Sequence, residues 1–161
     1  MRTRKGSIMN RRAAYVVVVG LVGLLAYVGS GQASGRYSLH SLNGVYGFSG
    51  SGTLFSGTVQ AAVVGLNSFD GAGSCKITAR LNAGGSVQSL TSKECSYTVN
   101  RDGTGSINST FNEPPFGPFT TDFVFVDGNK ELYIVLSDGF GGNTVASGMS
   151  KRQGPGEPDR H

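Results

Sequence analysis

Residues 119–137 read FTTDFVFVDGNKELYIVLS, two apolar runs on either side of an Asp-Gly-Asn turn. Gly and Asn readily adopt the positive φ angles that tight hairpins need, so this stretch predicts an antiparallel hairpin. With Gly128 and Asn129 as the turn, one face of the hairpin is almost wholly apolar, because it pairs Phe125 with Leu132, Phe123 with Ile134 and Thr121 with Leu136. The other face is mixed, pairing Val126 with Glu131, Val124 with Tyr133 and Asp122 with Val135.

The same pattern of apolar segments and glycine-rich turns recurs on both sides of this hairpin. It predicts eight strands, at residues 45–51, 58–69, 74–82, 87–99, 105–111, 119–126, 131–137 and 144–150. Short connections join neighbouring strands antiparallel, and closure into a barrel removes the unpaired edges. We therefore expect an all-β chain, a single antiparallel eight-stranded meander β-barrel over residues 42–152. A two-sheet sandwich is the alternative, although its crossings need longer connections.

The first 33 residues differ in character from the rest of the chain. Five Lys and Arg residues precede an apolar run at 13–28, and small residues follow at 29–33. This order is typical of an export signal, so we expect a signal helix at 1–33 and a periplasmic or secreted protein. The apolar run is close to the roughly 17–25 residues that span a bilayer, so an uncleaved inner-membrane anchor through residues 13–28 remains the alternative. A polar lead-in at 34–41 and a disordered tail at 153–161 complete the predicted organisation.

The basic charge of the chain belongs to this leader. The whole chain has 14 Lys and Arg residues against 10 acidic ones, but none of the acidic residues lies before residue 34. The remainder therefore carries nine basic and ten acidic side chains, which are dispersed along the sequence. Nucleic-acid binding needs clustered Lys and Arg on the folded part, so we expect no nucleic-acid partner.

Cys75 and Cys95 are the two cysteines of the chain. In an oxidising compartment such a pair forms a disulfide more readily than it persists as free thiols. A three-residue hairpin loop at 84–86 places Cys75 opposite Cys95 and puts Val87 on the same face as Cys95. Lys93 also falls on that face, so we expect a bulge or an edge position at Lys93.

Several segments resemble a family of small exported bacterial β-proteins of uncharacterised function, with recurrent Asp-Gly-x-Gly hairpin turns. They are residues 42–48 (LNGVYGF), 69–73 (FDGAG), 97–105 (YTVNRDGTG), 122–128 (DFVFVDG) and 148–152 (GMSKR). The resemblance implies a fold and an export route, and no activity. A looser likeness is to calycins, the lipocalin-like barrels, in which a basic residue packs over a Gly-x-aromatic signature. Here Gly44-Val45-Tyr46 with Lys151 or Arg152 matches that arrangement, with Tyr in place of the usual Trp.

The residues give little support for catalysis. The two histidines, His40 and His161, lie outside the predicted strands, so a Ser-His-Asp mechanism or a zinc site lacks its ligands. Asp122 lies among apolar residues and is the candidate for a buried carboxylate with a raised pKa, although an outward-facing aspartate explains the same pattern. We predict no catalytic residue, no cofactor and no metal.

The favoured hypothesis is therefore an exported, non-catalytic binding or interaction module that takes a small apolar ligand or a protein partner. Five aromatic residues could line a lumen, or simply fill the core: Tyr46, Phe48, Phe123, Phe125 and Tyr133. The first alternative is a structural envelope protein or an exported protease inhibitor. The second is a barrel cyclase or isomerase that uses Asp122 as its one buried carboxylate. Periodicity alone does not distinguish a hollow barrel from a filled one.

Overall fold

The structure, a computed structural model, describes residues 36–112, 117–139 and 144–154. The predicted signal helix at 1–33 and the last seven residues of the predicted tail lie outside this description. Within it, no helix is long and apolar enough to cross a membrane.

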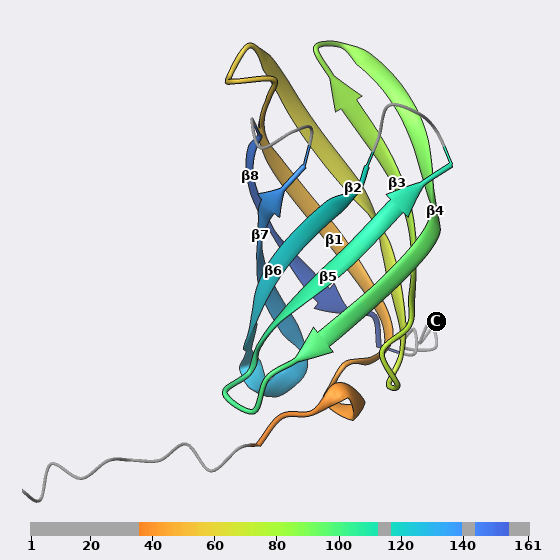
Figure 1. Ribbon diagram of the computed structural model, residues 1–161, viewed down its shortest axis with the longest axis vertical. Helices are drawn as coiled ribbons and strands as arrows, with labels where there is room; N and C mark the ends of the chain where they lie inside the picture. The colour runs from red at the N-terminus through yellow and green to blue at the C-terminus, as the bar shows by residue number, and fades with distance from the viewer. Residues whose placement is uncertain (1–35, 113–116, 140–143, 155–161) are drawn as a thin grey trace, which may run out of the picture. The chain divides into compact units, whose positions relative to one another are not determined.

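The described chain forms a closed antiparallel barrel in which eight strands follow one another in sequence order and β8 pairs with β1 (Figure 1). This confirms the predicted all-β meander barrel and excludes the two-sheet sandwich. The strands are β1 (Asn43–Leu54), β2 (Val59–Asp70), β3 (Cys75–Ala83), β4 (Ser86–Val99), β5 (Thr104–Phe111), β6 (Phe119–Val126), β7 (Glu131–Asp138) and β8 (Val145–Arg152). They differ from the predicted segments only at their ends.

The β6–β7 hairpin has the predicted register throughout, from Val126 opposite Glu131 to Thr121 opposite Leu136. Its connection is longer than the predicted two-residue turn. Residues 127–130 form a loop that contains the short 3-10 helix η2 (Asp127–Asn129), with positive φ at all three of its residues. The predicted turn and the observed loop leave the same residues opposite one another, so the register predicted from burial of the apolar face is also the observed one.

The turn of the β3–β4 hairpin is one residue shorter than predicted, and the bulge at Lys93 compensates for this difference. The turn is the two-residue Gly84-Gly85, with φ of 58° and 91°, so Ala83 pairs with Ser86. One extra residue then enters β4 at the bulge between Ser92 and Glu94, as predicted for Lys93. The bulge reverses which face β4 presents, so Val87 lies outside the barrel, 57% exposed, and not on the face of Cys95.

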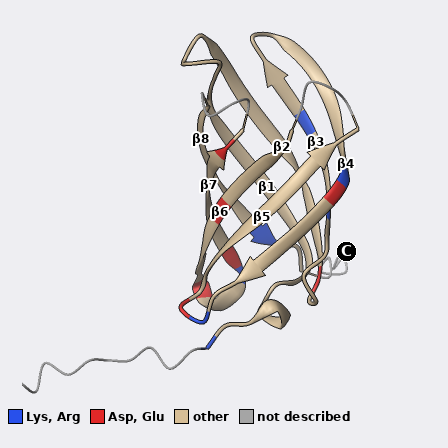
Figure 2. Ribbon diagram, viewed as in Figure 1, with Lys and Arg blue, Asp and Glu red and all other residues tan. Residues whose placement is uncertain are grey.

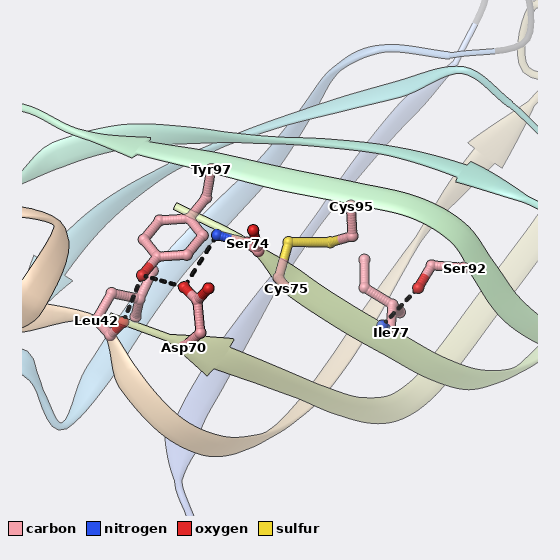
Figure 3. The surroundings of a disulfide bond; sticks show 8 residues. All are labelled: Leu42, Asp70, Ser74, Cys75, Ile77, Ser92, Cys95 and Tyr97. Carbon is pink, nitrogen blue, oxygen red and sulfur yellow. Dashed lines mark hydrogen bonds between the residues drawn. A yellow bond between two sulfur atoms is a disulfide. The ribbon is translucent and has the colours of Figure 1, made fainter. Parts of the chain in front are cut away.

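The bulge also brings the two cysteines together. Beyond it, Ser74 pairs with Ser96, one residue out of step with the register near the turn. Cys75 therefore lies opposite Cys95, with their Cα atoms 4.9 Å apart, and the two form the predicted disulfide (Figure 3).

Aromatic side chains pack the half of the barrel where β1 begins, here called the lower half. The rings of Tyr46 and Phe69 meet edge to face at 5.5 Å, and those of Phe69 and Tyr97 at 5.1 Å. Phe123 and Phe125 are buried beside them, together with Leu42 and Leu132. Such ring pairs stabilise a core beyond their buried area.

The lead-in closes this lower end. The 3-10 helix η1 (Leu39–Ser41) lies beneath the strands (Figure 1). The Tyr97 hydroxyl donates a hydrogen bond to the Leu42 carbonyl at 2.9 Å, and the Tyr37 ring stacks on Phe125 at 4.8 Å. Tyr37 thus attaches residues 36–41 to the core, while none of the residues of η1 is buried.

Of the two basic residues at the end of β8, Arg152 is the one that lies beside Gly44. A Cβ placed on Gly44 would lie 3.5 Å from the Arg152 guanidinium, and Tyr46 pairs with Arg152 across β1 and β8. Burial raises the pKa of the Tyr46 phenol, while the charge of Arg152 acts in the opposite direction. Lys151 instead is exposed and pairs with Glu131.

Candidate functional site

The upper half of the barrel, where β1 ends, is hollow. Inward positions that carry aromatic rings in the lower half carry small residues here, listed by strand as Gly50 and Gly52 of β1, Ala61 of β2, Ala79 of β3 and Ala146 and Gly148 of β8. Larger side chains at the alanine positions would fill the interior, whereas a Cβ on Gly52 or Gly148 would meet the backbone of the paired strand. The result is a cavity of about 170 Å³.

The wall of the cavity is apolar. Its larger members include Phe48 of β1, Ile77 and Leu81 of β3, Ile107 and Phe111 of β5, and Ile134 of β7. Among the described residues that line the cavity, none is charged. Apolar walls with few polar groups are typical of small-molecule sites.

Of the four polar residues in this wall, Ser51, Asn67, Thr121 and Ser147, only Asn67 is buried. It lies on the inward face of β2, between Tyr46 of β1 and Ile77 of β3, and is only 5% exposed. Its carbonyl oxygen Oδ1 accepts no hydrogen bond within the described residues. Three other buried hydroxyls there share this property, those of Thr110, Thr144 and Ser150, but none of these residues lines the cavity.

Sequence reasoning did not identify Asn67, although a signal was present. In β2 the inward positions are every second residue from Val59 to Phe69, and Asn67 is the polar member of that series. A polar residue in an inward, otherwise apolar series points to a buried group with a specific role.

Only one of the five aromatic residues proposed for a lumen contacts the cavity. Phe48 lines it, with its ring over Gly65, where a Cβ would meet the Phe48 ring at 2.7 Å. Tyr46, Phe123 and Phe125 fill the core of the lower half instead. The lumen prediction is wrong for Tyr133, which is 53% exposed on the outside of β7.

The buried-carboxylate prediction for Asp122 is also wrong. Asp122 pairs with Val135 on the outer face of the β6–β7 hairpin, and its side chain is exposed. Successive side chains of a strand point to opposite faces, and Phe123 points into the core, so the neighbouring Asp122 points outward.

The carboxylates with shifted pKa values hold turns. Asp70 accepts backbone hydrogen bonds from Ala72 at 2.7 Å and Ser74 at 2.9 Å, which lower its pKa (Figure 3). Asp102 accepts bonds from the backbone and hydroxyl of Thr104, which lower its pKa in the same way. Both residues are exposed and belong to turns at the lower end, away from the cavity.

The disulfide lies between the packed and hollow halves. Cys75 is two residues from Ile77, a cavity residue, and the Ile77 amide donates to the Ser92 hydroxyl at 2.9 Å (Figure 3). The disulfide and this hydrogen bond therefore fix β4 against β3 around the bulge.

In the view of Figure 2, charged residues are spread along the strands and turns rather than gathered on one face. Within the described residues, no group of three or more His, Cys, Asp or Glu side chains could hold a metal ion. The lining residues offer apolar contact together with the carboxamide of Asn67 and the hydroxyls of Ser51, Thr121 and Ser147.

No protein-family model and no curated protein matches the chain. A solved structure described as EF1p2_mFAP2b bound to DFHBI is similar to it, with a TM-score of 0.51 and 15% sequence identity. The match covers 74% of this chain and 99% of that one. At this identity the likeness is one of fold.

Proposed function

We propose that this chain is an exported, non-catalytic binding module that takes a small, uncharged, apolar ligand into the upper half of its barrel. The observation that carries the proposal is the apolar cavity of about 170 Å³. An apolar cavity of about 150 Å³ engineered into another protein binds benzene, so this one is large enough for a single ring.

Two further observations support the proposal. The structurally similar EF1p2_mFAP2b is described as bound to DFHBI, so a protein of similar fold holds a ligand. The lower half carries the aromatic core, and the Tyr97–Leu42 hydrogen bond covers its end, so the cavity lies in a barrel that is packed and closed at its other end.

The test is a titration of the full, oxidised chain with toluene, followed by NMR chemical shifts or calorimetry. Ala79→Phe puts a ring into the cavity, and Thr78→Phe, one residue along β3 on the exposed face, is the matched control. We expect toluene to bind the wild-type chain and Thr78→Phe, and to bind Ala79→Phe at least about tenfold more weakly.

Because Ala79→Phe risks overpacking, Ala146→Leu offers a second, smaller obstruction from β8. Failure of toluene to bind the wild-type chain, or equal binding to folded Ala79→Phe and Ala146→Leu, would overturn the proposal.

The exported location rests on the leader and on the disulfide, which persists in oxidising compartments. Thiol alkylation of the native host's extracellular and periplasmic fractions, without reduction, should leave Cys75 and Cys95 unmodified. Recovery of the chain only from the cytoplasm, with both thiols alkylated, would contradict export.

A further inference from the structure

We propose that Asn67 is the polar anchor of the cavity and that the ligand is a neutral one-ring alcohol or phenol whose hydroxyl donates to Asn67 Oδ1. The proposal rests on the proposed function and deepens it, because it names the chemistry that the cavity selects.

The first argument is the state of the Asn67 side chain. It is 95% buried, and its carbonyl oxygen accepts no hydrogen bond from any described residue. Native proteins rarely leave a buried carbonyl oxygen without a donor, since the lost hydration is not recovered. A ligand that brings a donor into the cavity recovers it.

The second argument is the position of Asn67 in the cavity. On either side along β2, the inward neighbours are Phe69, which belongs to the packed core, and Gly65, which has no side chain. Asn67 therefore stands at the boundary between the two halves, and the Phe48 ring over Gly65 lines the same cavity. A ring in the cavity has apolar walls beside it while its hydroxyl points toward the floor at Asn67.

The third argument concerns charge and size. A carboxylate or an ammonium group would enter this wall without a counter-charge, because no described lining residue is charged, and desolvating such an ion is costly. The volume fits one ring with a small substituent. A neutral ring carrying one hydroxyl satisfies both limits.

The experiment compares phenol with toluene, which differ by a hydroxyl in place of a methyl group. Both are titrated by calorimetry into the full oxidised wild-type chain, Asn67→Leu and Asn108→Leu. Asn108 is the matched control, since it is exposed on β5 and its Oδ1 accepts from the Thr120 hydroxyl at 2.9 Å.

The quantity measured is the ratio of the phenol affinity to the toluene affinity. The two probes differ in hydration, but this difference is the same for all three proteins, so it does not affect a comparison of the ratio between them. We expect this ratio to fall about tenfold in Asn67→Leu and to stay at the wild-type value in Asn108→Leu.

Each outcome decides something different. An unchanged ratio in Asn67→Leu, with toluene still bound, would overturn the anchor and leave the proposed function standing. Preference of the wild-type chain for acetophenone, which accepts but does not donate, would overturn the donor assignment. If neither phenol nor toluene bound the wild-type chain, the anchor and the proposed function would fail together.

Discussion

Replacing Asn67 with leucine should make the protein more stable. The two side chains have the same branching and the same number of heavy atoms, so the change removes an unpartnered polar group with little new volume. A buried carbonyl oxygen without a donor costs about 1–3 kcal/mol, and Asn67 is 5% exposed with Oδ1 unpartnered within the described residues. We expect the free energy of unfolding to rise by about 1–2 kcal/mol.

The assay is urea denaturation of the oxidised chain. With a slope of about 1.5 kcal/mol/M, a gain of about 1.5 kcal/mol raises the midpoint by about 1 M while the slope stays constant. Asn108→Leu should have the opposite sign, since it removes an acceptor from the Thr120 hydroxyl on the exposed face. A lower midpoint for Asn67→Leu would refute the reasoning, because it would mean that the folded protein already satisfies the carboxamide.

A stabilising change that also removes phenol selectivity would show that the residue is retained at a cost to the fold. That combination separates a binding role from a structural one, in which stability and selectivity would fall together.

Three further predictions concern the rest of the barrel. Two backbone amides hold the pKa of Asp70 below its ordinary value, so its contribution to stability is complete above about pH 4 and is lost as pH falls toward the lowered pKa. Urea midpoints between pH 5 and 2 should therefore fall less steeply for Asp70→Asn than for the wild-type chain, and parallel curves would contradict this. Tyr97→Phe removes the hydroxyl that donates to Leu42 and should cost about 1–2 kcal/mol, with faster amide exchange in η1 but not in β6; unchanged exchange would count against the role of this bond in closing the lower end. Replacing both Cys75 and Cys95 with alanine opens a loop with a sequence separation of 20 and should lower the free energy of unfolding by about 3 kcal/mol. A loss no larger than about 0.5 kcal/mol would instead show that the β3–β4 pairing alone constrains this loop.

The fold was largely predictable from the sequence because its signals are local. Alternation of apolar residues and glycine-rich turns identify the eight strands, and burial of one face sets the β6–β7 register. The disulfide was predicted for a partly wrong reason. A turn shorter by one residue and a bulge at Lys93 compensate, so Cys75 and Cys95 meet although the predicted loop and the position of Val87 do not hold.

The site was less predictable because the cavity depends on which inward residues meet across the closed barrel. Gly50 of β1 lies beside Gly148 of β8, a pairing that no single hairpin reveals. The exposed position of Tyr133, in contrast, follows from local strand pairing. The predicted register already put it on the face opposite Phe123 and Phe125, and the structure confirms that register.

The division between a packed lower half and a hollow upper half has a consequence for how such a protein can diverge. Residues such as Gly50 and Ala146 face the ligand space and do not belong to the buried core that includes the aromatic rings of the other end. Substitutions at these positions change the shape of the cavity while the strand pairing and the closed barrel stay the same. Evolution or protein engineering can therefore change the ligand specificity of the barrel one side chain at a time, while the packing of the lower half stays unchanged.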